Sequence, residues 1–395
     1  MRVTAYHLDP RGPMHFGDRT GGVESTGDTC RADTLFSALC FAVLETQGAG
    51  RLEAMLADFR AGRPPFILTS AFPRVGDIRL IPRPRLLRPL PDGTESSSHD
   101  RLAPRSAKIL KKVRYFSWDI ACRSIGGADI VPPDGGSSET IGGAGDPDGG
   151  FSIWFSSAEQ RRLALSDTGN GPDGNLWRRR GPSLERIEPW WHSGGASRVP
   201  RVLVDRVTGA STLFHSARLV FRQGSGLHVM FRWHDEMWRP AVEGALKFLG
   251  DTGIGGERAV GHGQFTIGSI EDVDIPVPAE ANGFVTLSPY CPTLSEIGHH
   301  LADGVLGPGA SWELGIHGGW IGVPGVALRQ STVTMVSEGS SLCLPVDADP
   351  SSAIFGQLHD VTPRPRELVP HPIYRYGYAF PWPAVLHVDD VEELP

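Results

Sequence analysis

The sequence has few lysines, few cysteines and no long hydrophobic run. Only four of the 38 basic residues are lysines, so arginine carries nearly all of the positive charge. Arginine suits phosphate contacts and base stacking, but a GC-rich genome favours it equally. The five cysteines show no CxxC or paired Cys/His spacing, which predicts neither a disulfide framework nor a metal site and fits a reducing cytoplasm. No apolar run approaches the ~20 residues that cross a bilayer, so no membrane partner is expected.

The overall composition is that of a globular protein with many turns. The 49 glycines and 33 prolines predict short strands and few long helices. A chain of 395 residues fits two packed halves better than one compact domain. The net charge of −7 argues against nucleic acid covering the whole surface. It allows a local basic groove, because salt screens surface charges beyond about 10 Å.

Hydrophobic patterning predicts strands and helices in both halves of the chain. The first half begins with a strand at 2–8, a glycine-punctuated loop, and a helix that Asp33 caps and Gly48 ends. The second half contains three strands, a short helix and a glycine-rich loop, predicted at 200–209, 213–222, 226–233, 241–250 and 251–265. Open sheets with helices on one face predict an α+β protein of two ferredoxin-like (RRM-like) domains.

The predicted domains divide near residue 200. The N-terminal domain covers 1–199 and carries a large basic insertion at about 74–150, which ends in a low-complexity stretch near 130–150. The C-terminal domain covers 200–395 and contains the glycine-rich loop and a β-rich extension.

The glycine-rich loop is the densest motif. Glycines at 253, 255, 256, 261 and 263 surround Arg258 and His262. Glycine lets a backbone approach a phosphate closely and present successive N–H donors. The loop follows a helix and precedes a strand, which is the reverse of a dinucleotide-binding turn. Composition alone leaves two interpretations open, a flexible connection or a nucleic-acid contact.

The insertion combines cations with aromatic residues. Arg74, Arg79, Arg83, Arg85 and Arg88 lie among prolines, and Arg105, Lys108, Lys111, Lys112 and Arg114 are followed by Tyr115, Phe116 and Trp118. Such interleaving suits single-stranded RNA, since phosphates pair with cations and bases stack on rings. The alternative is a solvated charged face whose aromatics belong to the core.

Several motifs together resemble the RAMP superfamily of CRISPR proteins, and within it the family of the fourth subunit of the type III-A (Csm) complex. They occur in the family's order over nearly the whole chain: HFGD (15–18), RADTLFSAL (31–39), VDRVTGAS (204–211), GIGGERAVGHGQF (253–265) and HPIYRYGYAF (371–380).

The resemblance implies a non-catalytic structural subunit of an antiviral RNA-guided complex, without cofactor or metal. Its implied partners are the repeat-derived 5′ handle of the guide RNA, a large polymerase-like subunit and the backbone RAMP subunit. Motif position and the basic arm give the expected RNA contacts: His15, Phe16, Gly17, Arg31, Arg105, Lys108, Lys111, Lys112, Arg114, Gly253, Gly255, Gly256, Arg258, Gly261, His262 and Gly263.

His15 supports one alternative, a metal-independent endoribonuclease that processes repeat RNA. A histidine with a pKa near neutrality can act as general base for attack by a 2′-hydroxyl. Arg19 or Arg31 could supply a cation at the phosphate. The competing interpretation is a loop histidine that makes an ordinary hydrogen bond or contacts RNA without chemistry.

Overall fold

The computed structural model describes most of the chain. It covers residues 1–17, 23–86, 113–128, 140–142, 152–156, 158–159, 162, 177–180, 183–186, 191–192, 199–221, 224–298, 304–321, 328–345 and 348–386. The protein is of mixed α+β type, dominated by sheet with few helices, which confirms the predicted class at that level.

The helices in these residues are mostly short. The α-helices are α1 (Ala32–Gln47), α2 (Ala49–Arg60), α4 (Trp118–Ile125), α6 (Arg239–Thr252) and α7 (Leu294–Ile297), and the 3-10 helices are η2 (Glu236–Trp238), η3 (Arg258–Val260) and η5 (Arg366–Leu368). None of these helices has the length and apolar character that a membrane span requires.

The strands fall into one large sheet and several small ones. The large sheet contains β1 (Arg2–Pro10), β2 (Phe66–Leu68), β3 (Phe72–Val75), β4 (Ile78–Pro82), β5 (Val113–Ser117), β6 (Thr140–Gly142), β7 (Ser152–Ser156), β14 (Ser225–Trp233) and β15 (Phe265–Asp274). The small sheets contain β8 (Trp177–Arg180), β9 (Ser183–Arg186), β10 (Trp191–His192), β11 (Val199–Val204), β12 (Ser211–Ser216), β13 (Val220–Phe221), β16 (Gly283–Thr286), β17 (Leu314–His317), β18 (Val333–Val336), β19 (Ser341–Cys343), β20 (Gly356–Asp360), β21 (Tyr374–Tyr378) and β22 (Pro381–Ala384).

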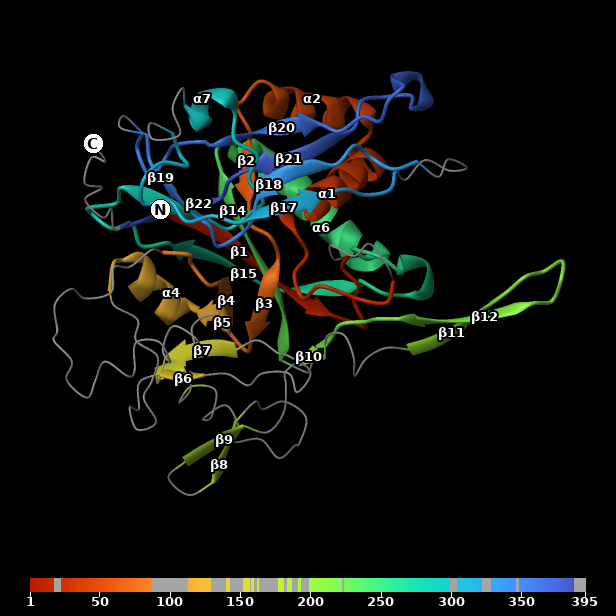
Figure 1. The fold of residues 1–395 in the computed structure, drawn as a ribbon, viewed down its shortest axis with the longest axis horizontal. Coiled ribbons are helices and arrows are strands. Elements are labelled where there is room, and N and C mark those ends of the chain that lie inside the picture. The colour runs from red at the N-terminus through yellow and green to blue at the C-terminus, as the bar shows by residue number, and fades with distance from the viewer. Residues whose placement is uncertain are drawn as a thin grey trace, which may run out of the picture.

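The large sheet joins segments from distant parts of the chain (Figure 1). Its order is β15-β1-β14-β3-β4-β5-β7-β6, with β2 also pairing β14. The strand β1 lies antiparallel to both β14 and β15, with Tyr6 opposite Val229 on one side and Ile270 on the other. Helices α1 and α6 pack against each other, and their apolar residues join the core of this sheet.

The predicted domain boundary between residues 199 and 200 separates segments that belong to one sheet. The elements β14, α6 and β15 follow that boundary in sequence, yet they share a sheet and a core with β1 and α1. Alternating hydrophobicity predicts that a segment is a strand, but it carries no information about a distant pairing partner. The sequence therefore predicted these elements without predicting the sheet they would join.

The C-terminal motif at 371–380 packs against the N-terminal helices. The ring of Tyr376 lies 5.0 Å from that of Phe36 in α1, and its hydroxyl accepts a hydrogen bond from the N–H of Leu68 at 3.1 Å. Tyr378 packs against Phe59 of α2 with ring centroids 5.7 Å apart. The aromatic residues of this motif therefore belong to the core.

Asp33 does not cap α1, which corrects the expectation from sequence. The helix begins at Ala32, so Asp33 lies in the first turn, and it is fully buried. Its carboxylate forms an ion pair with Arg375, and its Oδ2 lies 2.8 Å from Nδ1 of His317. Burial alone would raise the pKa of Asp33, but His317 and Arg375 hold it well below its ordinary value. The carboxylate of Asp33 therefore binds two residues from distant parts of the chain instead of capping the helix.

Candidate nucleic-acid interface

The loop at residues 11–17 and the glycine-rich loop at 253–263 lie against each other. The N–H of Gly256 donates to the carbonyl oxygen of His15 at 2.8 Å, and the N–H of Gly263 donates to that of Pro13 at 2.8 Å. The structure therefore brings together two of the predicted motifs that are far apart in sequence.

Two glycines make this close approach possible. Gly255 and Gly263 have φ angles of 84° and 85°, a region that side chains disfavour. A Cβ at Gly255 would collide with the carbonyl oxygen of His15, and one at Gly263 would collide with that of Ile254. Packing within the protein thus accounts for glycine at these two positions.

Most N–H donors of the loop glycines are already used inside the protein. Besides Gly256 and Gly263, Gly253 and Gly261 donate to carbonyl oxygens of the chain at 2.7 Å and 3.0 Å. Among the five glycines, only the N–H of Gly255 lacks a partner within the part of the chain that the structure describes. The loop does not present the expected row of glycine N–H donors to a phosphate, because four of these N–H groups already donate to carbonyl oxygens of the protein.

Three of the expected contact side chains are buried beneath the loop. His15, Phe16 and His262 are 5%, 3% and 6% exposed, whereas Gly17 is exposed. The Nδ1 of His15 lies 2.9 Å from the carbonyl oxygen of Ala217. Burial and the nearby charge of Arg201 lower the pKa of His262. These three side chains support the loop from inside.

The outer rim of the loop is accessible. Arg258 and Gly261 are exposed, and the Arg258 side chain has no partner among the described residues. An ion pair of 3.5 Å between Arg201 and Glu257 joins this rim to β11. The rim therefore places one free cation beside the base of the β11–β12 hairpin.

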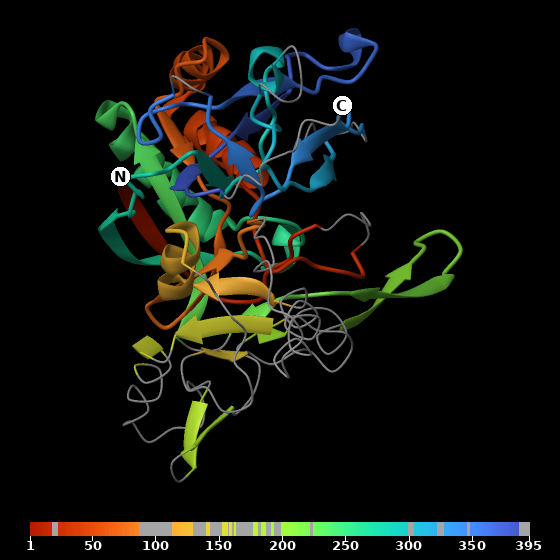
Figure 2. The ribbon, with the colours of Figure 1, turned by 60° about the vertical axis from the view of Figure 1, so that its left-hand side comes forward.

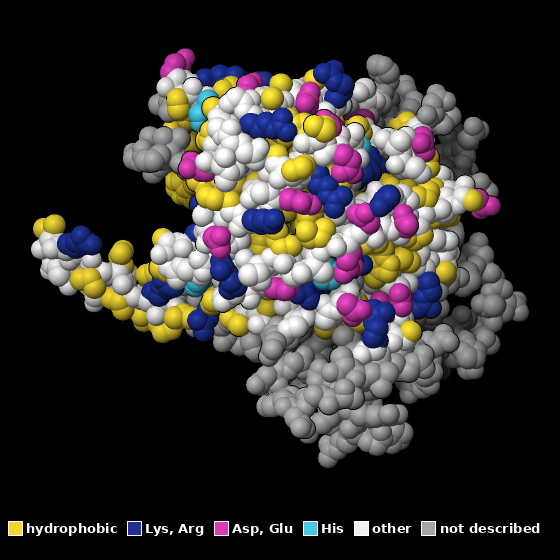
Figure 3. Space-filling view, turned by 180° about the vertical axis from the view of Figure 1, so that it is seen from behind, with side chains coloured by type: hydrophobic (Ala, Val, Ile, Leu, Met, Phe, Trp, Pro, Cys, Tyr) yellow, Lys and Arg dark blue, Asp and Glu magenta, His cyan; other side chains and the backbone are white. Residues whose placement is uncertain are grey.

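The β11–β12 hairpin projects from the body of the protein (Figures 1 and 2). Figure 3 shows apolar and basic side chains along it. The exposed apolar residues are Val202, Leu203, Val204, Val207 and Leu213. The sequence predicted both strands but missed their projection. The signal was the consecutive run at 202–204, which does not alternate as a half-buried strand does.

The basic arm is described only in part. Arg105, Lys108, Lys111 and Lys112 lie outside the described residues. Arg114 lies in β5, where its guanidinium is 3.0 Å from Oδ1 of the buried Asp28. The hydroxyl of Tyr115 donates to the same oxygen at 2.9 Å. Asp28 therefore fixes two neighbouring side chains of the arm.

A pocket of about 390 Å³ brings Arg31 and Arg114 together with Arg83 and Arg85. We call it the arginine pocket; the remaining residues that line it are Thr29, Phe72, Pro82, Val113, Tyr115, Glu313 and Glu338. Arg31 and Arg114 were expected contacts. Arg83 and Arg85 were noted only as members of a proline-rich basic run, because nothing in sequence places them beside Arg31.

The charges in the arginine pocket are unevenly compensated. Arg85 forms an ion pair with Glu313. The Nε of Arg83 donates to the carbonyl oxygen of Val113 at 3.1 Å, but neither Arg83 nor Arg31 meets a carboxylate among the described residues. Burial and the neighbouring Arg85 lower the pKa of Arg83. Arg31 and Arg83 thus form no ion pair within the described residues, although the carboxylate of Glu338 lines the same pocket.

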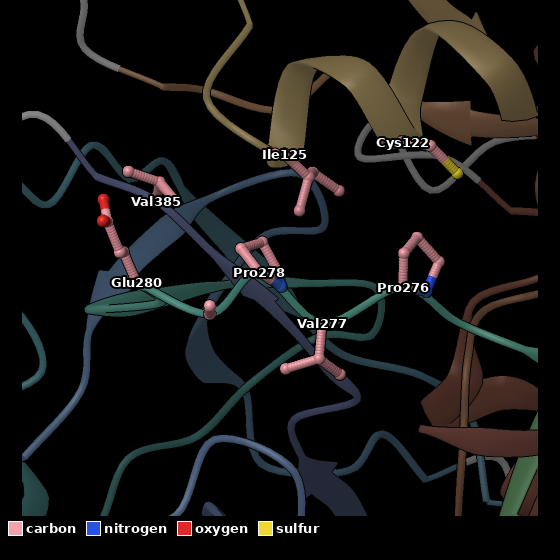
Figure 4. Close-up of a pocket in the computed structure, with 9 residues that line it drawn as sticks. Cys122, Ile125, Pro276, Val277, Pro278, Glu280 and Val385 are labelled. Carbon is pink, nitrogen blue, oxygen red and sulfur yellow. The ribbon is translucent and has the colours of Figure 1, made fainter.

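A second pocket, of about 360 Å³, differs in chemistry (Figure 4). Ile125 of α4 faces Pro278 and Val385 across it, and most of its lining is apolar. The charged residue in the lining is Glu280, which would repel a phosphate. In the described residues, no three His, Cys, Asp or Glu side chains come together to hold a metal ion.

Part of the chain matches a known family. Residues 279–384 match the family model of the CRISPR Csm4 C-terminal domain. The chain is also 25% identical to the CRISPR system Cms protein Csm4 of Thermococcus onnurineus across 383 residues, which is 96% of each chain.

Solved structures share the fold. A chain of the Csm3-Csm4 subcomplex in the type III-A CRISPR-Cas interference complex matches with a TM-score of 0.55 at 15% identity, covering 97% of this chain and 99% of that one. A chain of the Csm1-Csm4 cassette in complex with cA4 matches with a TM-score of 0.54 at 20% identity, covering 98% and 100%.

Proposed function

Because the chain belongs to the Csm4 family, we propose that it is a structural, non-catalytic subunit of a type III-A CRISPR RNA-guided complex. The observation that carries this proposal is the relationship to a Csm4 protein over nearly the entire length of both chains. A relationship that included only one domain would leave the role of the other open.

Its partners follow from the assemblies in which similar folds occur. A Csm1-Csm4 cassette and a Csm3-Csm4 subcomplex both contain a chain of this fold. We therefore assign this protein a large polymerase-like subunit and a backbone RAMP subunit as its neighbours, and the 5′ handle of the guide RNA as its nucleic-acid ligand.

The proposed RNA contacts are of two kinds. Exposed or half-buried groups face the RNA: Gly17, Gly261 and Arg258 at the loop rim, and the exposed Arg114 and half-buried Arg31 in the arginine pocket. Buried residues of the predicted set hold the loop in shape: His15, Phe16, Gly253, His262 and Gly263. Gly255 and Gly256 are half-buried between these groups. Arg105, Lys108, Lys111 and Lys112 remain proposed contacts from sequence alone.

The order of elements supports a ferredoxin-like N-terminal domain. The sequence β1-α1-β2/β3-β14-α6-β15, with strand order β15-β1-β14-β3, has the βαββαβ connectivity of that fold. On this proposal the chain between β3 and β14 is one long insertion. The second ferredoxin-like domain stays a prediction.

The alternative of an endoribonuclease is testable at His15. A general base must reach its substrate, and this side chain is buried against the carbonyl oxygen of Ala217. We expect no cleavage of repeat RNA by the purified chain and no difference for His15→Ala. Cleavage by the wild type that His15→Ala abolishes would replace the structural role with an enzymatic one.

The proposal as a whole is tested by affinity purification of the tagged chain from cells that carry a CRISPR array, followed by RNA sequencing and protein identification. We expect guide RNAs with one common 5′ end, together with a large polymerase-like subunit and a backbone subunit. Recovery of repeat RNA cut at one position, without partner subunits, would contradict it.

A further inference from the structure

The arginine pocket contains arginines that form no ion pair within the described residues. The inference drawn from them rests on the proposed function. Arg83 and Arg31 line the pocket and form no ion pair within the described part of the chain, and Glu338 is the one lining carboxylate that is not paired with an arginine there. A partly buried cation that makes no ion pair is stabilised when a ligand supplies an anion. Guanidinium groups bind phosphate oxygens through paired N–H donors. A phosphate is therefore the fitting anion.

The part of the pocket lining formed by Thr29, Arg114 and Tyr115 is held in place before any ligand arrives. Asp28 binds both Arg114 and Tyr115, and the hydroxyls of Thr29 and Tyr115 lie 2.7 Å apart. Asp28 and Tyr115 are buried, whereas the Arg114 side chain reaches the surface from this anchor. Side chains fixed in this way lose little entropy on binding, which favours a ligand that fits their arrangement.

The pocket also contains an acceptor. One carboxylate oxygen of Glu338 accepts a hydrogen bond from the hydroxyl of Ser70 at 2.6 Å. Its second oxygen has no hydrogen-bond partner within the described residues. An ionised carboxylate accepts hydrogen bonds and donates none. It therefore selects a ligand group with donors, such as the Watson–Crick edge of guanine with its adjacent N1–H and N2–H groups.

We propose that the arginine pocket binds one guanine nucleotide of the guide-RNA handle, with a phosphate against Arg31 and Arg83 and the base edge on Glu338. The pocket volume of about 390 Å³ is in the range of sites for small ligands. Uracil fits this arrangement poorly, because carbonyl oxygens flank its single N3–H donor and would face the carboxylate. The pocket thus reads the handle at one position, while the loop rim contacts the backbone elsewhere.

The test uses the complex of this chain with its large subunit and a synthetic guide RNA that carries the handle. Arg83→Ala and Arg31→Ala should each weaken binding by about 10- to 100-fold, the range expected when a hydrogen bond between charged groups is lost. Arg60→Ala is the matched control, because Arg60 is on α2 and pairs with Glu53 outside the pocket. Arg83→Lys keeps the charge and should retain part of the affinity, and thermal unfolding verifies that each variant is folded.

Base reading is tested with RNAs in which inosine, which lacks the N2 amino group, replaces each handle guanine in turn. One position should lose about tenfold in affinity with the wild type, the effect of one hydrogen bond to a charged group. The same position should lose nothing further with Glu338→Leu, which leaves no acceptor for the N2 amino group. A handle without a sensitive guanine, or Arg83→Ala binding as tightly as Arg60→Ala, would overturn the inference. Those results would leave the proposed function intact, whereas a wild-type complex that binds no handle RNA would contradict the function itself.

Discussion

The glycine-rich loop and the arginine pocket differ in how visible they are in the sequence and in what they offer a ligand. The loop is the densest motif of the chain, yet four of its five glycine N–H groups donate to the protein's own carbonyl oxygens. The pocket has no motif, since its arginines come from three separate segments, yet two of them lack a carboxylate partner among the described residues.

This difference separates two reasons for an unusual local sequence. Glycines concentrate wherever backbones must approach closely, whether the neighbour is a ligand or another loop of the same protein. Unpaired charge in a partly buried position is costly to folding and therefore points more directly to an absent partner. The two regions should respond to mutation in opposite ways, stability changing in the loop and binding changing in the pocket.

The largest effect is expected at Gly263. Gly263→Ala would force a methyl group onto the carbonyl oxygen of Ile254 at a φ of 85°, and we expect a loss of about 4 kcal/mol of unfolding free energy. Gly261→Ala is the control, because Gly261 has the same φ of 85° but open space around it. It should lose only about 1 kcal/mol. Urea unfolding measures both, and equal losses would mean that close packing is not why the loop is rich in glycine.

A compensated charge should behave differently from the free ones in the pocket. Asp33→Asn removes the partner of the buried Arg375 and should lower the unfolding free energy by about 3 kcal/mol near neutral pH. The contribution of Asp33 is present above the ordinary aspartate pKa of about 3.9 and disappears as the pH falls below it, because the folded pKa is depressed.

The variant should therefore lose less stability than the wild type when the pH falls from 5 to 3. Asp251→Asn is the control, since Asp251 is exposed and pairs with a half-exposed Arg11. Unfolding curves across this pH range that are parallel for wild type and Asp33→Asn would show that the buried pair makes no pH-dependent contribution.

Removing an uncompensated charge should stabilise the protein. Arg83→Met keeps much of the side-chain volume and removes a half-buried cation that forms no ion pair within the described residues, so we expect a gain of about 1 kcal/mol in unfolding free energy. Arg60→Met, on an exposed ion pair, should change stability by less than about 0.5 kcal/mol. A clear loss of stability for Arg83→Met would indicate that the pocket is structurally compensated after all.

The smallest effect is expected in the salt dependence of handle binding. Each phosphate contact adds about one unit to the slope of log affinity against log salt, so Arg83→Met should reduce that slope by about one. Gly261→Ala at the loop rim should leave the slope unchanged, because it alters no charge. A smaller slope for the glycine variant alone would reverse the roles assigned to the two regions.

The local hydrophobic pattern of the sequence was sufficient to predict individual helices and strands, but not to predict which distant segments meet in the fold. The periodicity of 34–48 predicted α1, and alternation predicted the strands β1 and β14. Their pairing could not be predicted, because alternation specifies a face and not a neighbour. The arginine pocket was missed for the same reason, since Arg31, Arg83 and Arg114 meet only through the tertiary fold. The family resemblance predicted that both His15 and the glycine-rich loop face RNA, and this stays a prediction; that the two loops pack against each other could not be predicted, because their contact depends on the tertiary fold.

The ion pair between Asp33 and Arg375 has a consequence for how the protein is made. The two residues are 342 positions apart in sequence, so a ribosome has synthesised nearly the entire chain before Asp33 meets its partner. Until then the first turn of α1 contains a carboxylate that cannot be buried without an energetic penalty. A chain that stops before Arg375 would therefore carry a buried carboxylate without its arginine partner, two residues from Arg31 of the arginine pocket. We expect such a chain to be less stable than one that includes Arg375.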